Sequence, residues 1–377
     1  MKMKKWTALL LAALMLVSVM VGCGAKDSKE IKLGVLAPLT GNFAEHGKGF
    51  QTAIQMAVDE VNAAGGINGR TVTLNFSDTE GDQKKAADLV TTYAEDESYI
   101  GVLGGFSSGC AMAAAPICDE AGIPFISPTA SNIAFTQMSK YCFAMPGVSQ
   151  DETQLMSINC CSEFAQAKTV YVFALNSDWG LSALSGFKIG AEKVGLEVLG
   201  EETYASGETD FSAMITKAAN ADPDMIVILD QAPGTLINQI RTAGLTTRIG
   251  DYGASTSNEV ITLCGENAEG LVTIGLRLDT TSDKGKAFAD EFVERAGFDP
   301  TLWAAYAYEA ASIMLDAIKS CGENLSRDAV RDAIAATNAD YLLGNITFNA
   351  DGNRVIDFAN SPYKVSEVQN GIWVEVG

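Results

Sequence analysis

Histidine is nearly missing from this chain of 377 residues, because His46 is the only one. Any mechanism or metal site that needs two imidazole groups is therefore excluded. Basic residues are also scarce, with 26 lysines and arginines against 47 aspartates and glutamates, and the formal net charge is −21. A surplus of acid on this scale is unsuited to binding phosphate backbones, so no nucleic acid is expected as a partner.

Metal-binding cysteine motifs are missing too, although the chain contains eight cysteines. No CxxC or CxxH pair occurs, so zinc binding has no support. Seven of the cysteines lie beyond the N-terminal segment, and most of these are expected to be small buried hydrophobic residues. They are Cys110, Cys118, Cys142, Cys160, Cys161, Cys264 and Cys321.

The glycine-rich segments of the chain do not have the residue spacing of phosphate-binding or nucleotide-binding loops. Five residues separate Gly41 from Gly47, where the Walker A motif has four, and the glycines of Gly104–Gly109 do not form GxGxxG. No catalytic constellation remains either, because no residue is placed to activate a nucleophile. The sequence therefore predicts no cofactor, no metal and no enzyme activity.

The N-terminus has the layout of a secretory signal. Three lysines within the first five residues precede an uncharged run from Trp6 to Gly22. The following Met20-Val21-Gly22-Cys23 resembles the bacterial lipobox, in which the cysteine is lipidated. We expect a signal peptide over residues 1–22, a tether over 23–30 and a lipid on Cys23 that holds the protein at the outer face of the cell membrane. A retained helical anchor with an incidental cysteine is the alternative.

Beyond residue 30, short apolar runs alternate with segments of helical period. Such alternation predicts an α/β fold with parallel sheets covered by helices, and its restart near Val170 predicts two lobes. Pro146-Gly147 is the expected first crossover, and Gly344–Phe358 is the expected closing hairpin, with a turn at residues 351–353. Strands are expected at 31–37, 71–76, 100–103, 124–127, 170–174, 197–201 and 225–229, and helices at 49–64, 82–94, 110–121, 180–194, 211–219, 236–243 and 303–319.

Two edges between a strand and the next helix are rich in hydroxyl groups. Ser107-Ser108 opens the expected helix at 110–121, and the segment from Ser127 to Asn132 follows the next strand. Serine hydroxyls and free backbone amides in this position can bind a carboxylate without a formal positive charge. Simple helix capping is the alternative for these serines.

Several segments carry a family resemblance. They are IKLGVLAPLTG from Ile31, AVDEVNAAGGING from Ala57, AAPI from Ala114, EAGIPFISP from Glu120, DFS from Asp210 and FNADGN from Phe348. With them the chain resembles the type I periplasmic binding proteins from Ile31 to its end. Within that group it is most similar to the leucine-binding protein family, the substrate-binding lipoproteins of branched-chain amino acid ABC transporters.

The resemblance implies two Rossmann-like lobes joined by three crossover strands, with a ligand cleft between them. Lobe 1 would comprise residues 31–146 and 276–342, and lobe 2 residues 147–275 and 343–377. Such proteins are monomers that close over a small amino acid or carboxylate. They deliver it to an ABC permease and its ATPase.

The resemblance also places the ligand-binding residues. The carboxylate-binding serine of the family falls on Ser108, and its second group of donors falls on Thr129, Ala130 and Ser131. Trp179, from the second lobe, would cover the ligand.

Further candidates are less well matched. His46 stands where the family often has an aromatic residue, and the acid that many members use for the ligand ammonium aligns with Tyr252. Asp230 or Asp251 could substitute for that acid, but neither matches cleanly. A carboxylate ligand is therefore expected, while specificity for an amino acid stays open. The plainer alternatives are a solvated loop for His46, packing within the second lobe for Trp179 and a turn for Asp251.

Two functions remain in view. The first is an extracytoplasmic receptor of an ABC importer for a small amino acid, branched-chain or otherwise apolar. The second is a sensory or regulatory module of the same fold that binds small carboxylates or amides. The lipobox and the lack of an appended signalling domain favour the first.

Overall fold

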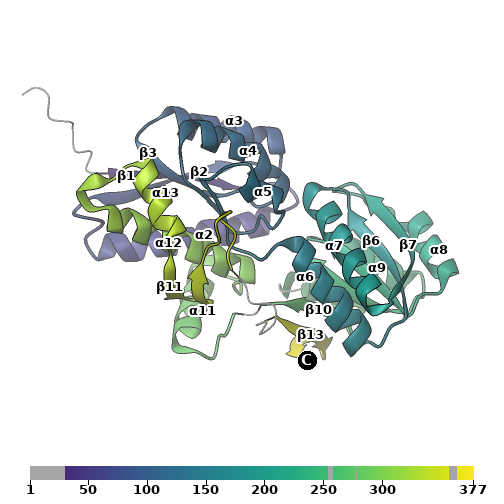
Figure 1. Cartoon of the computed structure of the whole chain (residues 1–377). Coiled ribbons are helices and arrows are strands. Elements are labelled where there is room, and N and C mark those ends of the chain that lie inside the picture. The colour runs from purple at the N-terminus through teal and green to yellow at the C-terminus, as the bar shows by residue number, and fades with distance from the viewer. Residues whose placement is uncertain (1–29, 254–257, 277, 356–362) are drawn as a thin grey trace, which may run out of the picture.

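The computed structural model describes residues 30–253, 258–276, 278–355 and 363–377, which form two lobes lying side by side (Figure 1). The expected signal peptide and Cys23 lie outside the described residues, as does the expected tether apart from Glu30. Among the residues described, no helix is both long enough and apolar enough to span a membrane.

The first lobe is built on a five-stranded parallel sheet in the order β2-β1-β3-β4-β5. The central strands β1, β3 and β4 are covered on both faces and are mostly apolar, and Leu33, Val35 and Leu36 of β1 are all fully buried. The strands are β1 (Glu30–Ala37), β2 (Thr71–Asp78), β3 (Tyr99–Gly104), β4 (Phe125–Ser127) and β5 (Cys142–Ala144).

Helices from both ends of the chain cover this sheet. One face packs against α2 (Ala44–Ala63) and α12 (Leu302–Cys321), and the other against α3 (Gln83–Glu95) and α4 (Ser108–Ala121). The remaining helices of the lobe are α5 (Ala134–Gln137), α11 (Asp283–Ala296) and α13 (Arg327–Ala335). Residues 283–335, late in the chain, thus return to complete the first lobe.

The second lobe contains a seven-stranded sheet in the order β14-β13-β10-β9-β8-β6-β7. Its first five strands in the chain are parallel, and the two C-terminal strands are antiparallel additions at one edge. They are β6 (Thr169–Leu175), β7 (Glu197–Tyr204), β8 (Met225–Asp230), β9 (Arg248–Gly253), β10 (Val272–Gly275), β13 (Lys364–Gln369) and β14 (Ile372–Glu375).

Alternate residues of the central strand β8 belong to two different cores. Val227 packs with the helices on one face, and Ile226 and Ile228 pack with those on the other. The first face carries α6 (Ser149–Leu155), its π-helical continuation (Met156–Phe164) and α7 (Asp178–Val194). The second carries α8 (Ser212–Ala221), α9 (Gly234–Thr242) and α10 (Asn258–Cys264).

The predicted fold class is confirmed, and most predicted elements lie within a few residues of the observed ones. Gly122, Gly195 and Gly244 have φ values of 59°, 69° and 83°, so the chain leaves a helix at each of them through the left-handed region. The structure adds the helix at 149–164, which the sequence analysis did not predict. All seven described cysteines are free thiols, and six of them are buried.

The division between the lobes differs from the expected one near the C-terminus. We expected residues 343–377 in lobe 2, but β12 (Gly344–Thr347) pairs with β11 (Asn338–Tyr341) beside α12. Asn353 then bridges Ala144 of β5, so the segment as far as Val355 belongs to the first lobe. The expected turn at 351–353 is present. The far end of the expected hairpin, Phe358, lies outside the described residues.

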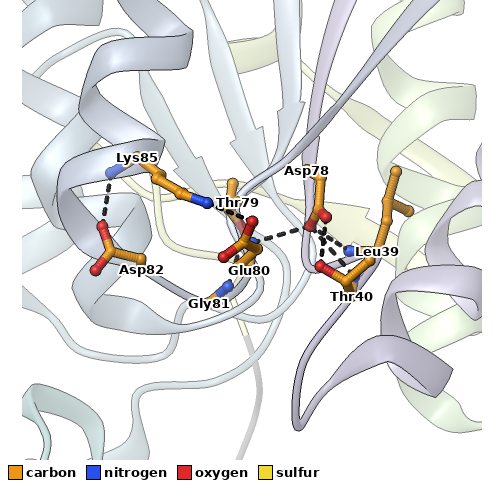
Figure 2. Close-up of polar contacts among 8 residues, drawn as sticks. All are labelled: Leu39, Thr40, Asp78, Thr79, Glu80, Gly81, Asp82 and Lys85. Carbon is orange, nitrogen blue, oxygen red and sulfur yellow. Dashed lines mark hydrogen bonds and ion pairs between the residues drawn. The ribbon is translucent and has the colours of Figure 1, made fainter.

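A carboxylate at the end of β2 fixes the loop between β1 and α2 (Figure 2). Asp78 accepts hydrogen bonds from the backbone amides of Leu39, at 2.8 Å, and Glu80, at 2.9 Å, and from the Thr40 hydroxyl at 2.6 Å. Burial opposes ionisation of Asp78, but these hydrogen bonds outweigh it and lower the pKa of the carboxyl. The loop leading to His46 is therefore firmly positioned.

Candidate functional site

A cleft lies between the two lobes. Its walls come from the segments that follow β4, β5, β6 and β8, from the carboxyl ends of β9 and β10, and from the beginnings of α6 and α12. Ligands of open α/β sheets bind at such edges. The lining residues are Thr129, Ser131, Pro146, Glu152, Trp179, Gln231, Tyr252, Gly253, Thr273, Ile274, Gly275, Leu276, Leu302, Trp303, Tyr306 and Tyr363.

On lobe 1, the two serines that open α4 have different tasks. Ser107 is the N-cap, and its hydroxyl accepts from the Cys110 amide at 3.2 Å. The Ser108 hydroxyl accepts from the backbone amide of Asn132 at 3.3 Å, which ties α4 to the neighbouring loop. Ser108 is buried and lies behind the cleft lining rather than in it. Capping is therefore the role of Ser107.

The loop after β4 brings hydroxyl groups to the cleft itself. Thr129 and Ser131 both line it, whereas Ala130 between them is turned into the core. Thr129 donates its hydroxyl to the Phe106 carbonyl at 2.6 Å. The Ser131 carbonyl accepts the Ser149 amide of α6 at 2.8 Å, so this loop also touches the helix that begins lobe 2.

The wall on lobe 2 is aromatic. Trp179 is the second residue of α7, and its indole stacks on the Tyr252 ring with centroids 5.8 Å apart and an interplanar angle of 12°. A side chain at Gly253, which has φ of 129°, would come within 2.7 Å of the indole. Trp179 is only 4% exposed, so it both packs the lobe and lines the cleft.

The lobes also meet at one edge of the cleft. Gln83 of the α3 start donates its side-chain amide to the Asp178 carboxylate at 3.1 Å. Asn132 donates to the Asp178 main-chain carbonyl at 3.0 Å. Both bonds join lobe 1 to the N-terminus of α7, beside Trp179.

His46 lies neither in a solvated loop nor in the lining. It is buried on α2, stacked on Phe106 at 5.1 Å and edge-on to Trp303 at 4.7 Å. Burial lowers the pKa of His46 to about 4, which leaves the imidazole neutral at pH 7. It supports Trp303, which does line the cleft.

The two aspartates considered as ammonium partners lie elsewhere. Asp230 accepts from the Tyr204 hydroxyl at 2.7 Å and lines a second groove together with Asn42 and Phe43. Asp251 is fully buried on β9 and, by strand alternation, faces away from Tyr252. Neither aspartate lines the main cleft.

Glu152 of α6 is instead the only carboxylate among the described lining residues, and that lining includes no lysine or arginine. The hydroxyls of Tyr252 and Tyr363 both donate to it. Burial raises the pKa of Glu152 to about 8. The hydrogen bonds from the Tyr363 hydroxyl and from the Gly147 backbone oppose this shift, because they stabilise the ionised carboxylate.

The sequence analysis missed several lining residues besides Glu152. Gln231 follows the end of β8, so the rule that ligands bind at strand ends could have found it. Trp303 and Tyr306 are three residues apart in the first turn of α12 and therefore share a face. Leu302 and Tyr363 carry no such signal.

Comparison of the sequence and the fold with known proteins identifies the family of this chain. Residues 30–371 match the family described as "Periplasmic binding protein". The chain belongs to this family. As a periplasmic binding protein it is a solute-binding receptor that works outside the cytoplasm, and the predicted resemblance is confirmed.

Individual relatives span nearly the whole chain. The "Leu/Ile/Val-binding protein homolog 2" of Brucella abortus is 27% identical over 358 residues, which cover 93% of this chain and 94% of the relative. The isoleucine complex of the substrate binding protein LivJ from Streptococcus pneumoniae has a TM-score of 0.83 at 28% identity, covering 92% of this chain and all of that one. A leucine binding protein from Thermotoga maritima has a TM-score of 0.84 at 25% identity, covering 92% and 98%.

Proposed function

We propose that this periplasmic binding protein is the receptor of an ABC importer. It binds a small apolar amino acid, such as leucine or isoleucine, between its lobes and delivers it to the permease and ATPase. The observation that carries this proposal is the composition of the cleft, in which a hydroxyl-lined loop of lobe 1 faces an aromatic wall of lobe 2. Relatives named for leucine, isoleucine and valine support it.

In this proposal each lobe holds one part of the ligand. The Ser131 hydroxyl and the main-chain amides of the loop from Thr129 to Ser131 hold the carboxylate, and Ser108 behind them keeps this loop in place through Asn132. Each hydrogen bond to a charged group contributes ~1.5–3 kcal/mol. Trp179 and Tyr252 cover the apolar side chain. A ligand that touches both walls favours the state in which the lobes are drawn together.

Outside the described residues, we propose that Cys23 is lipidated and that residues 1–22 are removed. The mature receptor then works as a monomer tethered to the outer face of the membrane. Mass spectrometry of the native N-terminus should find a diacylated Cys23, and Cys23→Ala should release or misprocess the protein. A native chain that retains residues 1–22 would contradict this.

The ligand is tested by a thermal-shift screen of amino acids and small carboxylates, followed by calorimetry. Leucine or isoleucine should raise the melting temperature, and small-angle scattering should show contraction on saturation. An unchanged scattering profile, or a ligand without an anionic group, would overturn the proposal.

The alternative is a sensory module for small carboxylates or amides. Tyr252 supports this alternative, because it stands where many family members have the acid that binds the ligand ammonium. Uptake assays decide between the two functions. Reconstitution of the protein with its permease and ATPase should support ligand-dependent ATP hydrolysis if it is a transport receptor, and no stimulation would favour the sensory module.

A further inference from the structure

Glu152 lies one helical turn from the hydroxyl-lined loop of lobe 1. The Ser149 amide donates to the Ser131 carbonyl at 2.8 Å, and Glu152 follows three residues later in the same helix. A helix rises about 1.5 Å per residue, so the Glu152 backbone lies about 4.5 Å along the helix axis from the residue that contacts this loop. Glu152 and Ser131 line the same cleft. An α-amino acid carries its carboxylate and ammonium on one carbon and needs two binding groups at such a spacing.

The surroundings of Glu152 leave its charge without a cation. Two tyrosine hydroxyls donate to it, and no lysine or arginine among the described residues forms an ion pair with it. One cationic side chain in this region, Arg354, lies over the Tyr306 ring at 5.8 Å and pairs with the buried Glu309 at 3.6 Å. The titratable groups around Glu152 are Tyr252, Tyr306, Tyr363, Asp151 and Arg354.

A buried carboxylate without a cationic partner is costly, and a carboxyl in a cleft whose pKa is strongly shifted by burial is a candidate for a functional group. Its two tyrosine donors hold the carboxyl at the cleft, with aromatic rings on either side.

We infer that Glu152 binds the ammonium group of the ligand, in place of the acid that Tyr252 replaces. The ligand is then an amino acid rather than a simple carboxylate. This inference rests on the proposed function, because it assigns the second polar group of the same ligand. Asp230 and Asp251 have no part in it, since neither lines the cleft.

Binding then moves a proton. With a pKa of about 8, Glu152 is mostly protonated in the empty cleft at pH 7. An arriving ammonium favours the carboxylate, so Glu152 loses its proton to the solvent as the ion pair forms. Amino-acid affinity should therefore increase from pH 6 to pH 8, and binding near pH 7 should release up to one proton.

The test compares ligands with and without an amine. L-leucine and L-isoleucine are titrated beside 4-methylpentanoate and 3-methylpentanoate, which have the same carbon skeletons. Calorimetry in two buffers of different ionisation enthalpy counts the protons released. Glu152→Gln removes the acid with little change in shape, Glu197→Gln is a matched exposed control on β7, and Asp251→Asn tests the rival acid.

We expect Glu152→Gln to weaken amino-acid binding at least tenfold, to abolish proton release and to leave the amine-free acids unaffected or tighter. Circular dichroism establishes that the variant folds, and proton release in the unmodified protein tests the inference without any variant. Amino-acid binding without proton release, or unchanged by Glu152→Gln, overturns the role of Glu152 while the receptor function stands. Binding of amine-free acids alone overturns both this role and the amino-acid ligand. Binding of none of the four probes contradicts the proposed function itself.

Discussion

The two walls of the cleft are built by different means. The hydroxyl-bearing part of the lobe 1 wall comes from two loops between residues 106 and 132, joined by local bonds such as that from Thr129 to the Phe106 carbonyl. Trp303 and Tyr306 of α12 add an aromatic part to the same wall. The lobe 2 wall brings together Glu152, Trp179, Tyr252 and Tyr363, which lie up to 211 residues apart in the chain.

This difference decides what each wall contributes. The lobe 1 wall offers hydroxyl and backbone groups that do not titrate near neutral pH. The lobe 2 wall offers the stacked rings of Trp179 and Tyr252 and one buried acid, so we expect it to carry the pH dependence of ligand binding. The following predictions test this contrast, beginning with the largest effect.

Trp179→Ala should lower the free energy of unfolding by ~3–5 kcal/mol, because it removes a buried indole and its stacking on Tyr252. Trp303→Ala is the matched change on the lobe 1 side of the cleft. Trp303 is only half-buried, so its removal should cost less. Urea unfolding of both variants checks this, and equal losses would contradict the contrast between the walls.

Glu152 should make the empty protein less stable as pH rises. Its pKa is about 8 in the folded state against 4.5 for the free group, so between these values the folded protein binds the extra proton. Stability from this group is full below pH 4.5 and is lost as pH rises towards 8, on the order of a few kcal/mol. Unfolding curves of the unmodified protein and Glu152→Gln should therefore converge at low pH and separate at high pH; parallel curves would refute the assignment.

His46, behind the lobe 1 side of the cleft, should act in the opposite direction. Its pKa falls from 6.5 to about 4 through burial, so the unfolded chain binds the proton more readily between these values. Stability should increase as pH rises from 4 to 6.5, by a smaller amount than the Glu152 effect. Replacement by glutamine should remove this slope in urea unfolding at pH 4–7, and an unchanged slope would locate its cause elsewhere.

The smallest effects should separate two serines of lobe 1. Ser131→Ala should weaken ligand binding by ~1.5 kcal/mol, about tenfold, with little loss of stability. Ser107→Ala removes an N-cap and should cost ~1 kcal/mol of stability while affinity is unchanged. Calorimetry and urea unfolding of both variants check this. The reverse pattern would show that the cleft lining has been assigned wrongly.

Much of the fold was predictable because its signals are local. Alternating apolar runs identified the strands, and glycines such as Gly122 and Gly195 marked helix ends through their left-handed backbone. The helix at 149–164 was missed, since it begins directly after the expected crossover at Pro146-Gly147. The segment at 344–355 was assigned to the wrong lobe, because its bridge to Ala144 joins residues about 200 positions apart.

The site divides in the same way. The sequence by itself determined the hydroxyl-rich loop with Thr129 and Ser131 and the position of Trp179 at a helix start, since strand ends and helix starts follow from periodicity. Only the tertiary structure decided which acid faces the ligand. Strand alternation turned Asp251 away from the cleft, and contacts between distant segments placed Glu152 beside two tyrosines. The surroundings of Glu152 are formed by chain segments that come together only on folding. The sequence next to Glu152 therefore could not predict them.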